Sequence, residues 1–290
     1  MKHYALILAT MLSLLIPMQS WGGKGLDAYE SGDYATALRE WKPLADQGNM
    51  SAQYNLGLLF NNGFGVPQNY KTALEWYTLS AKQGHASAQF NLGTMYASGR
   101  GILQDNKEAV KWYTLSAVQG HIEAQTNLGV MYANGLGVLQ NYETALKWFT
   151  LSAEQGHLLA QHNLGTLYVY GQGVLQDYKT ALKWFTLSAE QGHVSSQFNL
   201  GVMHDDGMGT PRDYKTAIKW YMLSAEQGNV YAQNNMGKMY DNGTGVSEDK
   251  VFAHMWFNIA SSNGFDLAKE NIQRITKKMT PSQIEEAQKL

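Results

Sequence analysis

The sequence predicts an all-α fold, an α-solenoid in which six 36-residue αα-hairpin repeats stack between capping helices. Three observations support this prediction. The motif Asn-Leu-Gly, or Asn-Met-Gly in the last copy, and a following Gly-x-Gly both recur every 36 residues. Apolar residues within each unit are spaced as on one side of a helix. Tryptophan keeps the same 36-residue step, at Trp76, Trp112, Trp148, Trp184, Trp220 and Trp256.

Each repeat contains two predicted helices, which we call helix A and helix B. In the first repeat, helix A covers about 51–62 and helix B about 69–83. Gly63 and Gly84 end the two helices, because glycine adopts the left-handed conformation common at helix ends. Gly57 lies inside helix A, where it lets a neighbouring helix approach closely at a propensity cost of ~1 kcal/mol.

The repeat phase sets the predicted boundaries. The N-terminal capping segment is 23–49; it resembles helix B, but its Trp41 is displaced by one position and it lacks Gly-x-Gly. The C-terminal capping helices are 266–290, where Thr280-Pro281-Ser282-Gln283 has the pattern of a capping box. The six repeats are 50–85, 86–121, 122–157, 158–193, 194–229 and 230–265.

The first 22 residues have the pattern of a secretory signal peptide. Lys2 and His3 precede an apolar run of 13 residues that ends at Pro17, shorter than the ~20 that span a bilayer. Cleavage after Ser20 and cleavage after Gly22 both fit. We therefore expect an exported protein, periplasmic or secreted, with no stable membrane insertion after cleavage.

Composition excludes several functions. The chain has 22 basic and 24 acidic residues, so it lacks the basic surface of a nucleic-acid-binding protein. It has no cysteine, which excludes disulfides, thiolate metal sites and thiol nucleophiles.

The repeat unit resembles the Sel-one-like repeat (SLR) family, which is related to tetratricopeptide repeats. The resemblance is carried by Ala-Gln-x-Asn-Leu-Gly-x-Met-Tyr, Gly-x-Gly-Val, Asp-Tyr-Lys-Thr-Ala, Trp-Phe and Ser-Ala-Glu-Gln-Gly, and it covers about residues 25–290. It implies a right-handed α-solenoid that serves as a scaffold or adaptor for protein partners.

No catalytic residue, metal site or cofactor is predicted. His85, His121, His157 and His193 occupy one repeat position, but equivalent residues of stacked helices lie roughly 8–10 Å apart, too far to share a metal ion. We interpret them as polar turn residues. His204, which is followed by two aspartates, and His254 replace the usual repeat residues and are interpreted as structural.

One alternative function comes from the same resemblance. Cysteine-rich relatives are described as binding or weakly hydrolysing β-lactams, but their cysteine pairs are absent here. Ser247-Glu248-Asp249-Lys250 matches Ser-x-x-Lys of serine β-lactamases without the other two elements of that set. Ser247 is expected to be a helix cap.

The positions that differ between repeats predict the binding surface. On helix A these are positions 51, 54, 58, 61 and 62 with their equivalents at 36-residue steps, and we call this surface the variable face. It lies opposite the constant apolar stripe of the helix and is expected to face the concave groove. The candidate partner-binding residues are Tyr54, Leu58, Phe90, Thr94, Thr126, Val130, His162, Thr166, Phe198, Val202, Asn234 and Lys238.

These observations predict a non-enzymatic scaffold that binds a protein or peptide along helix A. Relaxed packing of helix A and self-association of the chain would produce a similar pattern of variation, and the sequence leaves both open.

Overall fold

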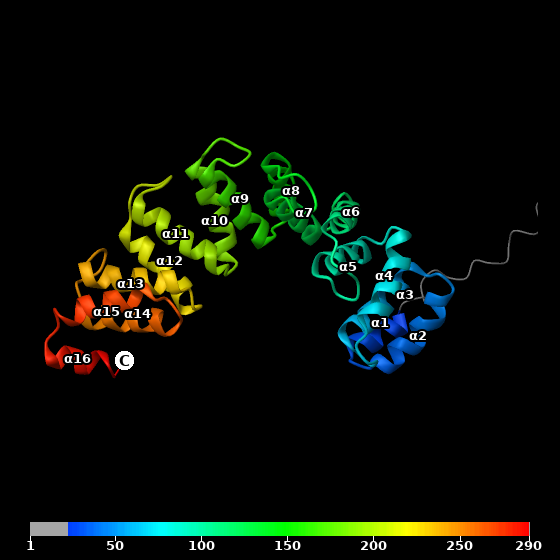
Figure 1. Cartoon of the computed structure of the whole chain (residues 1–290), viewed down its shortest axis with the longest axis horizontal. Coiled ribbons are helices and arrows are strands. Elements are labelled where there is room, and N and C mark those ends of the chain that lie inside the picture. The colour runs from blue at the N-terminus through cyan, green and yellow to red at the C-terminus, as the bar shows by residue number, and fades with distance from the viewer. Residues whose placement is uncertain (1–22, 290) are drawn as a thin grey trace, which may run out of the picture. The chain divides into compact units, whose positions relative to one another are not determined.

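The computed structural model describes residues 23–289, and all regular secondary structure in this range is helical (Figure 1). The predicted signal peptide, residues 1–22, lies outside the described residues. The helices are α1 (Gly23–Glu30), α2 (Tyr34–Asp46), α3 (Met50–Asn62), α4 (Tyr70–Lys82), α5 (Ala86–Ser98), α6 (Asn106–Ala117), α7 (Ile122–Asn134), α8 (Tyr142–Glu154), α9 (Leu158–Tyr170), α10 (Tyr178–Glu190), α11 (Val194–Asp206), α12 (Tyr214–Glu226), α13 (Val230–Asn242), α14 (Lys250–Ser262), α15 (Leu267–Thr276) and α16 (Pro281–Ala287).

The all-α repeat fold is confirmed: α3 to α14 form six consecutive hairpins, each made of one helix A and one helix B. The described residues divide into two compact units, with the boundary between residues 124 and 125 inside α7. In the first unit α3 packs on α4 and α5 on α6. In the second unit α9 packs on α10, α11 on α12 and α13 on α14 (Figure 1).

Polar caps and left-handed glycines fix the ends of the helices. Before α3 the Asn49 side chain accepts a hydrogen bond from the backbone N–H of Ala52, and before α4 Asn69 accepts from two N–H groups. Gly63 ends α3 with φ = 72°, a left-handed conformation. Since the equivalent residues cap most later hairpins in the same way, helix boundaries recur with the sequence period.

The hydrophobic core lies mainly between repeats rather than inside them. We use the term joint for the buried contact between helix B of one repeat and helix A of the next. Joints of this kind form between α4 and α5 in the first unit, and between α8 and α9, α10 and α11, and α12 and α13 in the second. A hairpin therefore buries its apolar surface only when a neighbour is stacked on it.

Within a hairpin, one glycine makes the close approach of the two helices possible. A Cβ at Gly165 of α9 would lie 2.8 Å from two ring atoms of Phe185 in α10, and Phe185 is fully buried. The expectation that the helix A glycine permits close packing is confirmed, with the helix B ring of the same repeat as its neighbour.

A buried glutamine adds polar specificity to each joint. Gln161 of α9 is 4% exposed. Its Nε2 donates to the carbonyl of Ala153 in the preceding repeat at 3.2 Å, and its Oε1 accepts from Nε2 of Gln191 at 2.8 Å. Equivalent bonds are made by Gln53, Gln89, Gln197 and Gln233, the last with Asn263 in place of a glutamine. Both ends of the buried amide are thus satisfied.

The N-terminal segment is a hairpin whose helices, α1 and α2, pack together. Trp41 is 3% exposed, and its ring lies against Gly25 so closely that no Cβ could be placed there. Trp41 therefore occupies the place of the buried aromatic Tyr77, which is 36 residues further on, rather than that of Trp76. This equivalence explains its one-position displacement.

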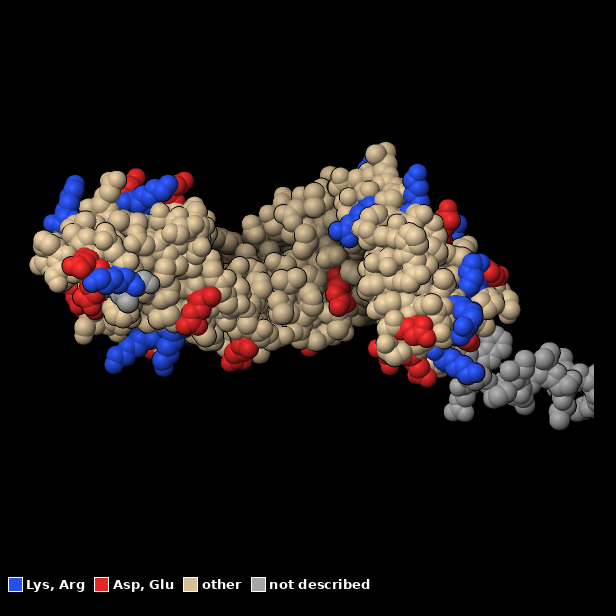
Figure 2. Space-filling view, turned by 90° about the horizontal axis from the view of Figure 1, so that it is seen from below, with Lys and Arg blue, Asp and Glu red and all other residues tan. Residues whose placement is uncertain are grey.

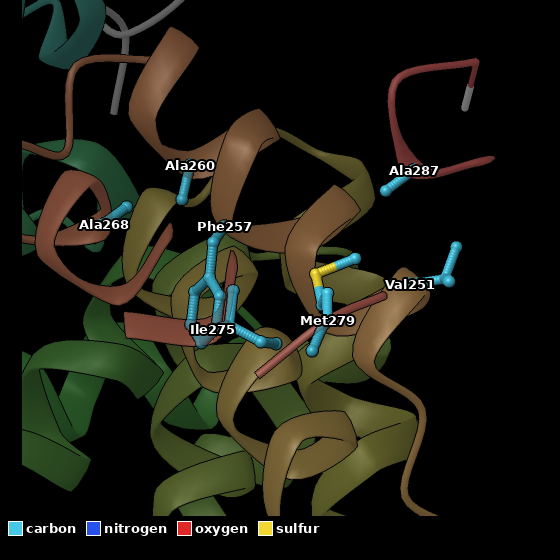
Figure 3. Close-up of a cluster of buried hydrophobic side chains, with 8 residues drawn as sticks. Val251, Phe257, Ala260, Ala268, Ile275, Met279 and Ala287 are labelled. Atoms are coloured by element: carbon cyan, nitrogen blue, oxygen red, sulfur yellow. The ribbon is translucent and has the colours of Figure 1, made fainter. Parts of the chain in front are cut away.

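The C-terminal helices cover the last repeat. Figure 3 shows Phe257 of α14 beside Ile275 of α15, and both side chains are fully buried. The predicted capping box is confirmed: Thr280 and Gln283 bond reciprocally at the start of α16.

An ion cluster joins the same helices. Asp241 of α13 is 3% exposed, and its carboxylate lies 2.9 Å from Nζ of Lys250 and 2.6 Å from Nη1 of Arg274 in α15. Burial alone would raise the pKa of Asp241, but the hydrogen bonds and positive charges of Lys250 and Arg274 hold it below the usual value.

Candidate functional site

In the first unit, the predicted binding residues of the variable face are half-buried. Tyr54 stacks on His85 at 4.5 Å between ring centroids and lies 5.9 Å from Tyr77 of α4. Phe90 stacks on His121 at 4.7 Å in the same way. Leu58 and Thr94 are also half-buried. In each case the histidine that ends the same repeat covers one side of the ring, so these side chains are only partly accessible to a partner.

Two predicted binding residues in the second unit are buried. Thr126 is 3% exposed, with its hydroxyl 2.7 Å from Oγ of Ser152 and 2.8 Å from Nδ1 of His157. Asn234 is 4% exposed and accepts a hydrogen bond from Asn271 of α15, which covers this part of α13. Their expected place on an accessible face is wrong, since a neighbouring element occupies the space that a partner would need.

Four other predicted residues come together in the second unit. His162 and Thr166 of α9 and Phe198 and Val202 of α11 line a cavity of about 430 Å³, which we call the α9–α11 cavity. Val130 and Lys238 do not line it: Val130 is half-buried beside the α8–α9 joint, and Lys238 is exposed on α13.

The α9–α11 cavity also contains residues that sequence reasoning did not name. Tyr170 at the end of α9 is 69% exposed, and Tyr231 at the start of α13 is 57% exposed. Tyr170 occupies variable position 62 and Tyr231 variable position 51, where the first two repeats have serine or asparagine. Position 62 is otherwise Asn, Ser or Asp, so the aromatic residue Tyr170 was a usable signal there. Val169 and Ser195, at positions 61 and 51, also line the cavity.

The cavity is electrically neutral at ordinary pH. None of the residues that line it is Lys, Arg, Asp or Glu. His162 donates to or accepts from Oγ of Ser196 at 2.9 Å through Nδ1, and burial, with a smaller contribution from nearby His193, lowers its pKa to about 4. On the face that Figure 2 presents, charged residues form small separate groups with uncharged surface between them. The cavity therefore suits an uncharged, largely apolar group.

The histidine series has a structural role, as predicted. His85, His121 and His193 precede helices α5, α7 and α11, and Nδ1 of each accepts a backbone hydrogen bond from the residue three positions on. His157 occupies the same place before α9, where its Nδ1 bonds Thr126 instead. Within residues 23–289, no group of three or more His, Asp or Glu side chains could hold a metal ion.

The remaining candidate positions are part of the packing. Lys250 is held by Asp241 and Glu248, and the cap of α14 is Asp249 rather than the expected Ser247, which is exposed. Asp205 accepts a hydrogen bond from the Tyr221 hydroxyl at 3.2 Å.

The other two substituted histidine positions are also structural. His254 is buried and lies 3.0 Å from the Asn258 amide. His204 is half-buried at the end of α11, and burial lowers its pKa.

None of the described helices has the length and apolarity needed to cross a bilayer.

The chain is similar to a repeat family and to solved members of it. A family model described as Sel1 repeat matches residues 51–85, 86–121, 122–157, 158–193, 194–229 and 230–265. A Sel1 repeat protein from Oxalobacter formigenes is 34% identical with a TM-score of 0.73, and the match covers 81% of this chain and 94% of that one.

A second similar structure is a protective antigen of uropathogenic Escherichia coli strains that displays an SLR fold. It is 31% identical with a TM-score of 0.83, and the match covers 91% of this chain. The chain spans 60% of that protein's length. No curated protein matches the chain.

Proposed function

Because the chain belongs to the Sel1 repeat family, whose members generally mediate protein–protein interactions, we propose that it is an exported, non-enzymatic adaptor. In this proposal a protein or peptide partner binds the variable face of the second unit, at α9, α11 and the start of α13. The partner-binding residues are His162, Thr166, Phe198 and Val202 from the predicted set, together with Tyr170 and Tyr231.

The α9–α11 cavity is the observation that carries the proposal. Stacked repeats present equivalent helix A positions side by side, and here those positions enclose a hollow of about 430 Å³. Tyr170 and Tyr231 remain more than half exposed beside it. Exposed aromatic side chains around a concave apolar surface are typical of binding sites, where they contribute much of the binding energy.

Export is proposed from the residues at the start of the chain. Lys2 and the apolar run that ends at Pro17 form the pattern of a cleaved signal, with cleavage after Ser20 or after Gly22. N-terminal sequencing of the protein recovered from fractionated cells tests this. Recovery in the exported fraction with a new N-terminus after one of these residues is expected, and recovery in the cytoplasm with an intact N-terminus would contradict export.

Affinity capture from envelope extract tests the adaptor role. The bait proteins are the wild type and a Tyr170→Ser/Tyr231→Ser variant. A matched control variant, Leu187→Ser/Leu223→Ser, removes apolar side chains that are 45% and 44% exposed on helices B of the fourth and fifth repeats. We expect a protein that is retained by the wild type and the control but lost by the tyrosine variant.

Two results would change the proposal. Equal retention by all three baits would remove the variable face of the second unit as the binding surface. A mass that rises with concentration in light scattering, and does so only with the two tyrosines in place, would assign this face to self-association instead.

A further inference from the structure

The α9–α11 cavity combines a buried interior with an exposed aromatic edge. Phe185 and Met203 are each 1% exposed, so they form its deepest part. Phe198 of α11 lies 5.9 Å from the ring of Tyr231, whose own ring contacts Phe265 edge-on at 5.3 Å. The rings at this edge are therefore held by their neighbours rather than free in solvent, and four aromatic side chains, including Tyr170, line one hollow.

The size and charge of the cavity restrict what can enter. Its volume of about 430 Å³ is at the lower end of the roughly 300–1,000 Å³ typical of ligand pockets. An ionised group would lose its hydration there without gaining a charged partner, since no Lys, Arg, Asp or Glu lines the cavity. An aromatic ring gains more than an aliphatic chain of similar size, because edge and face contacts with other rings add to the gain from area burial.

Two side-chain amides supply hydrogen bonds beside the aromatic residues. Asn199 of α11 is half-buried, and its amide has no hydrogen-bond partner within residues 23–289. Asn229 uses its Oδ1 to accept from the backbone N–H groups of Tyr231 and Ala232 at 3.0 Å each. In the same described range its NH₂ group makes no hydrogen bond. A peptide backbone offers one donor and one acceptor per residue, which matches the hydrogen-bonding capacity left on these amides.

Building on the proposed function, we propose that the α9–α11 cavity is a pocket for one uncharged aromatic side chain of an extended partner peptide. In this arrangement the ring lies among Phe185, Phe198, Tyr170 and Tyr231. The backbone that flanks the aromatic residue bonds the amides of Asn199 and Asn229. The partner therefore contains an uncharged peptide segment with a Phe, Tyr or Trp residue.

Blocked tripeptides test this specificity with the full purified protein. The probes are N-acetyl-Gly-X-Gly-amide with X as Trp, Phe, Leu, Asp or Lys, titrated and followed by NMR chemical shifts or calorimetry. We expect the Trp and Phe peptides to bind with a Kd of about 1 mM, which is reasonable for one anchored side chain. The Leu peptide should bind at least about threefold more weakly, because it lacks ring contacts. The Asp and Lys peptides should not saturate, because their charges would lose hydration in a neutral cavity.

Two variants with a matched control locate the binding. Ser195→Trp places a large ring in the cavity from an exposed position of α11, and Ser51→Trp makes the same change at the equivalent exposed position of α3. Ser195→Trp should weaken binding of the Trp peptide at least about tenfold, and Ser51→Trp should leave it unchanged. Tyr231→Ser, which removes a ring that is 57% exposed, should weaken it by about threefold to tenfold. Circular dichroism confirms that each variant is folded.

Three results would overturn the pocket assignment: equal binding of the Asp and Trp peptides, no effect of the two cavity variants, or no binding of any probe. The adaptor proposal can survive each of these. If envelope capture still depends on Tyr170 and Tyr231 while no tripeptide binds, the partner uses this face without inserting an aromatic residue. If capture is also absent, both proposals are wrong.

Discussion

The joints of the two units are nearly identical, whereas the variable faces of the same helices differ. In the first unit the α4–α5 joint buries Ala73, Tyr77 and Ala81 against Leu92 and Met95. In the second unit the α10–α11 joint buries Ala181, Phe185 and Ala189 against Leu200 and Met203. At variable positions 51 and 62, by contrast, α3 and α5 carry only serine and asparagine, while α9 has Leu159 and Tyr170 and α13 has Tyr231.

This difference shows which positions specify folding and which are available for recognition. Every joint must fill the same space, so its residues change little between repeats. The variable face is constrained only where an adjoining residue covers it, as His85 covers Tyr54. Substitutions at joints should therefore affect stability, and substitutions at uncovered variable positions should affect binding alone.

The largest loss of stability is expected from substitution of the helix A glycine in a hairpin. Gly165→Leu would place a side chain where even a Cβ comes within 2.8 Å of the Phe185 ring, and should destabilise the second unit by about 3 kcal/mol. The urea midpoint followed by circular dichroism measures the loss. Gly165→Leu/Phe185→Ala should recover part of it, because the smaller residue vacates space. An unchanged midpoint for Gly165→Leu would show that this contact is not close.

Loss of the ion cluster at the C-terminal end should reduce stability less than the glycine substitution does. Asp241→Asn removes the negative charge facing Lys250 and Arg274 while keeping the shape of the side chain, and should cost about 2 kcal/mol. The stabilities of the wild type and the variant are compared by thermal unfolding. Asp266→Asn, in which an exposed carboxylate leaves Lys269, is the control and should change little. Equal losses from both changes would contradict a special role for the buried carboxylate.

The free energy of unfolding should depend on acid pH through His162, whereas the phenylalanines at the same position in other repeats have no such effect. Partial burial, with a smaller contribution from His193, lowers the pKa of His162 from 6.5 to about 4, so the unfolded chain takes up the proton first as pH falls. Stability therefore declines between about pH 6.5 and 4, by roughly 2 kcal/mol from this residue at pH 4.5.

His162→Phe tests this contribution with a residue that already occurs at the same repeat position, in Phe90 and Phe198. The variant should lose less stability than the wild type when urea midpoints at pH 7.5 and pH 4.5 are compared. Ser196 keeps its bonds to Ser188 and His193 in the variant, so the cost at pH 7.5 should be under about 1 kcal/mol. Identical pH dependence in the two proteins would contradict the burial-lowered pKa.

The smallest effect on stability is expected at the uncovered tyrosines. Tyr170→Ser/Tyr231→Ser should change the free energy of unfolding by no more than about 1 kcal/mol per site, because both side chains are more than half exposed, although Tyr231 contacts two other rings. The same denaturation measurement checks it. A loss of several kcal/mol would assign these residues to packing and would contradict their role in recognition.

The repeat period predicted most of the fold. Glycines and polar caps recur with the tryptophans, so the hairpins, their ends and the capping box at Thr280 followed from local rules. The buried glutamine network was not predicted, although Gln161 and its equivalents also keep the 36-residue step. A helical projection shows which side of a helix a residue occupies, but it does not show which polar partners the preceding repeat and the second helix of the same repeat supply.

The candidate site was predicted only in part, for the same reason. Helix geometry grouped His162 with Phe198 and Val202, and these three residues line one cavity. It placed Thr126 and Asn234 on an accessible surface because it contained no information on Ser152 or Asn271, the neighbours that bury them. Burial in a stacked repeat depends on contacts outside the helix, and these contacts become visible only in three dimensions.

Site-specific photo-crosslinking in living cells tests the central claim most directly. A benzophenone amino acid is introduced at Tyr231 on the variable face and, separately, at Leu223 on helix B of the preceding repeat; these side chains are 57% and 44% exposed. We predict a discrete covalent adduct with a partner protein from position 231 and none from position 223. Adducts from position 223 alone, or equally from both positions, would contradict recognition through the variable face.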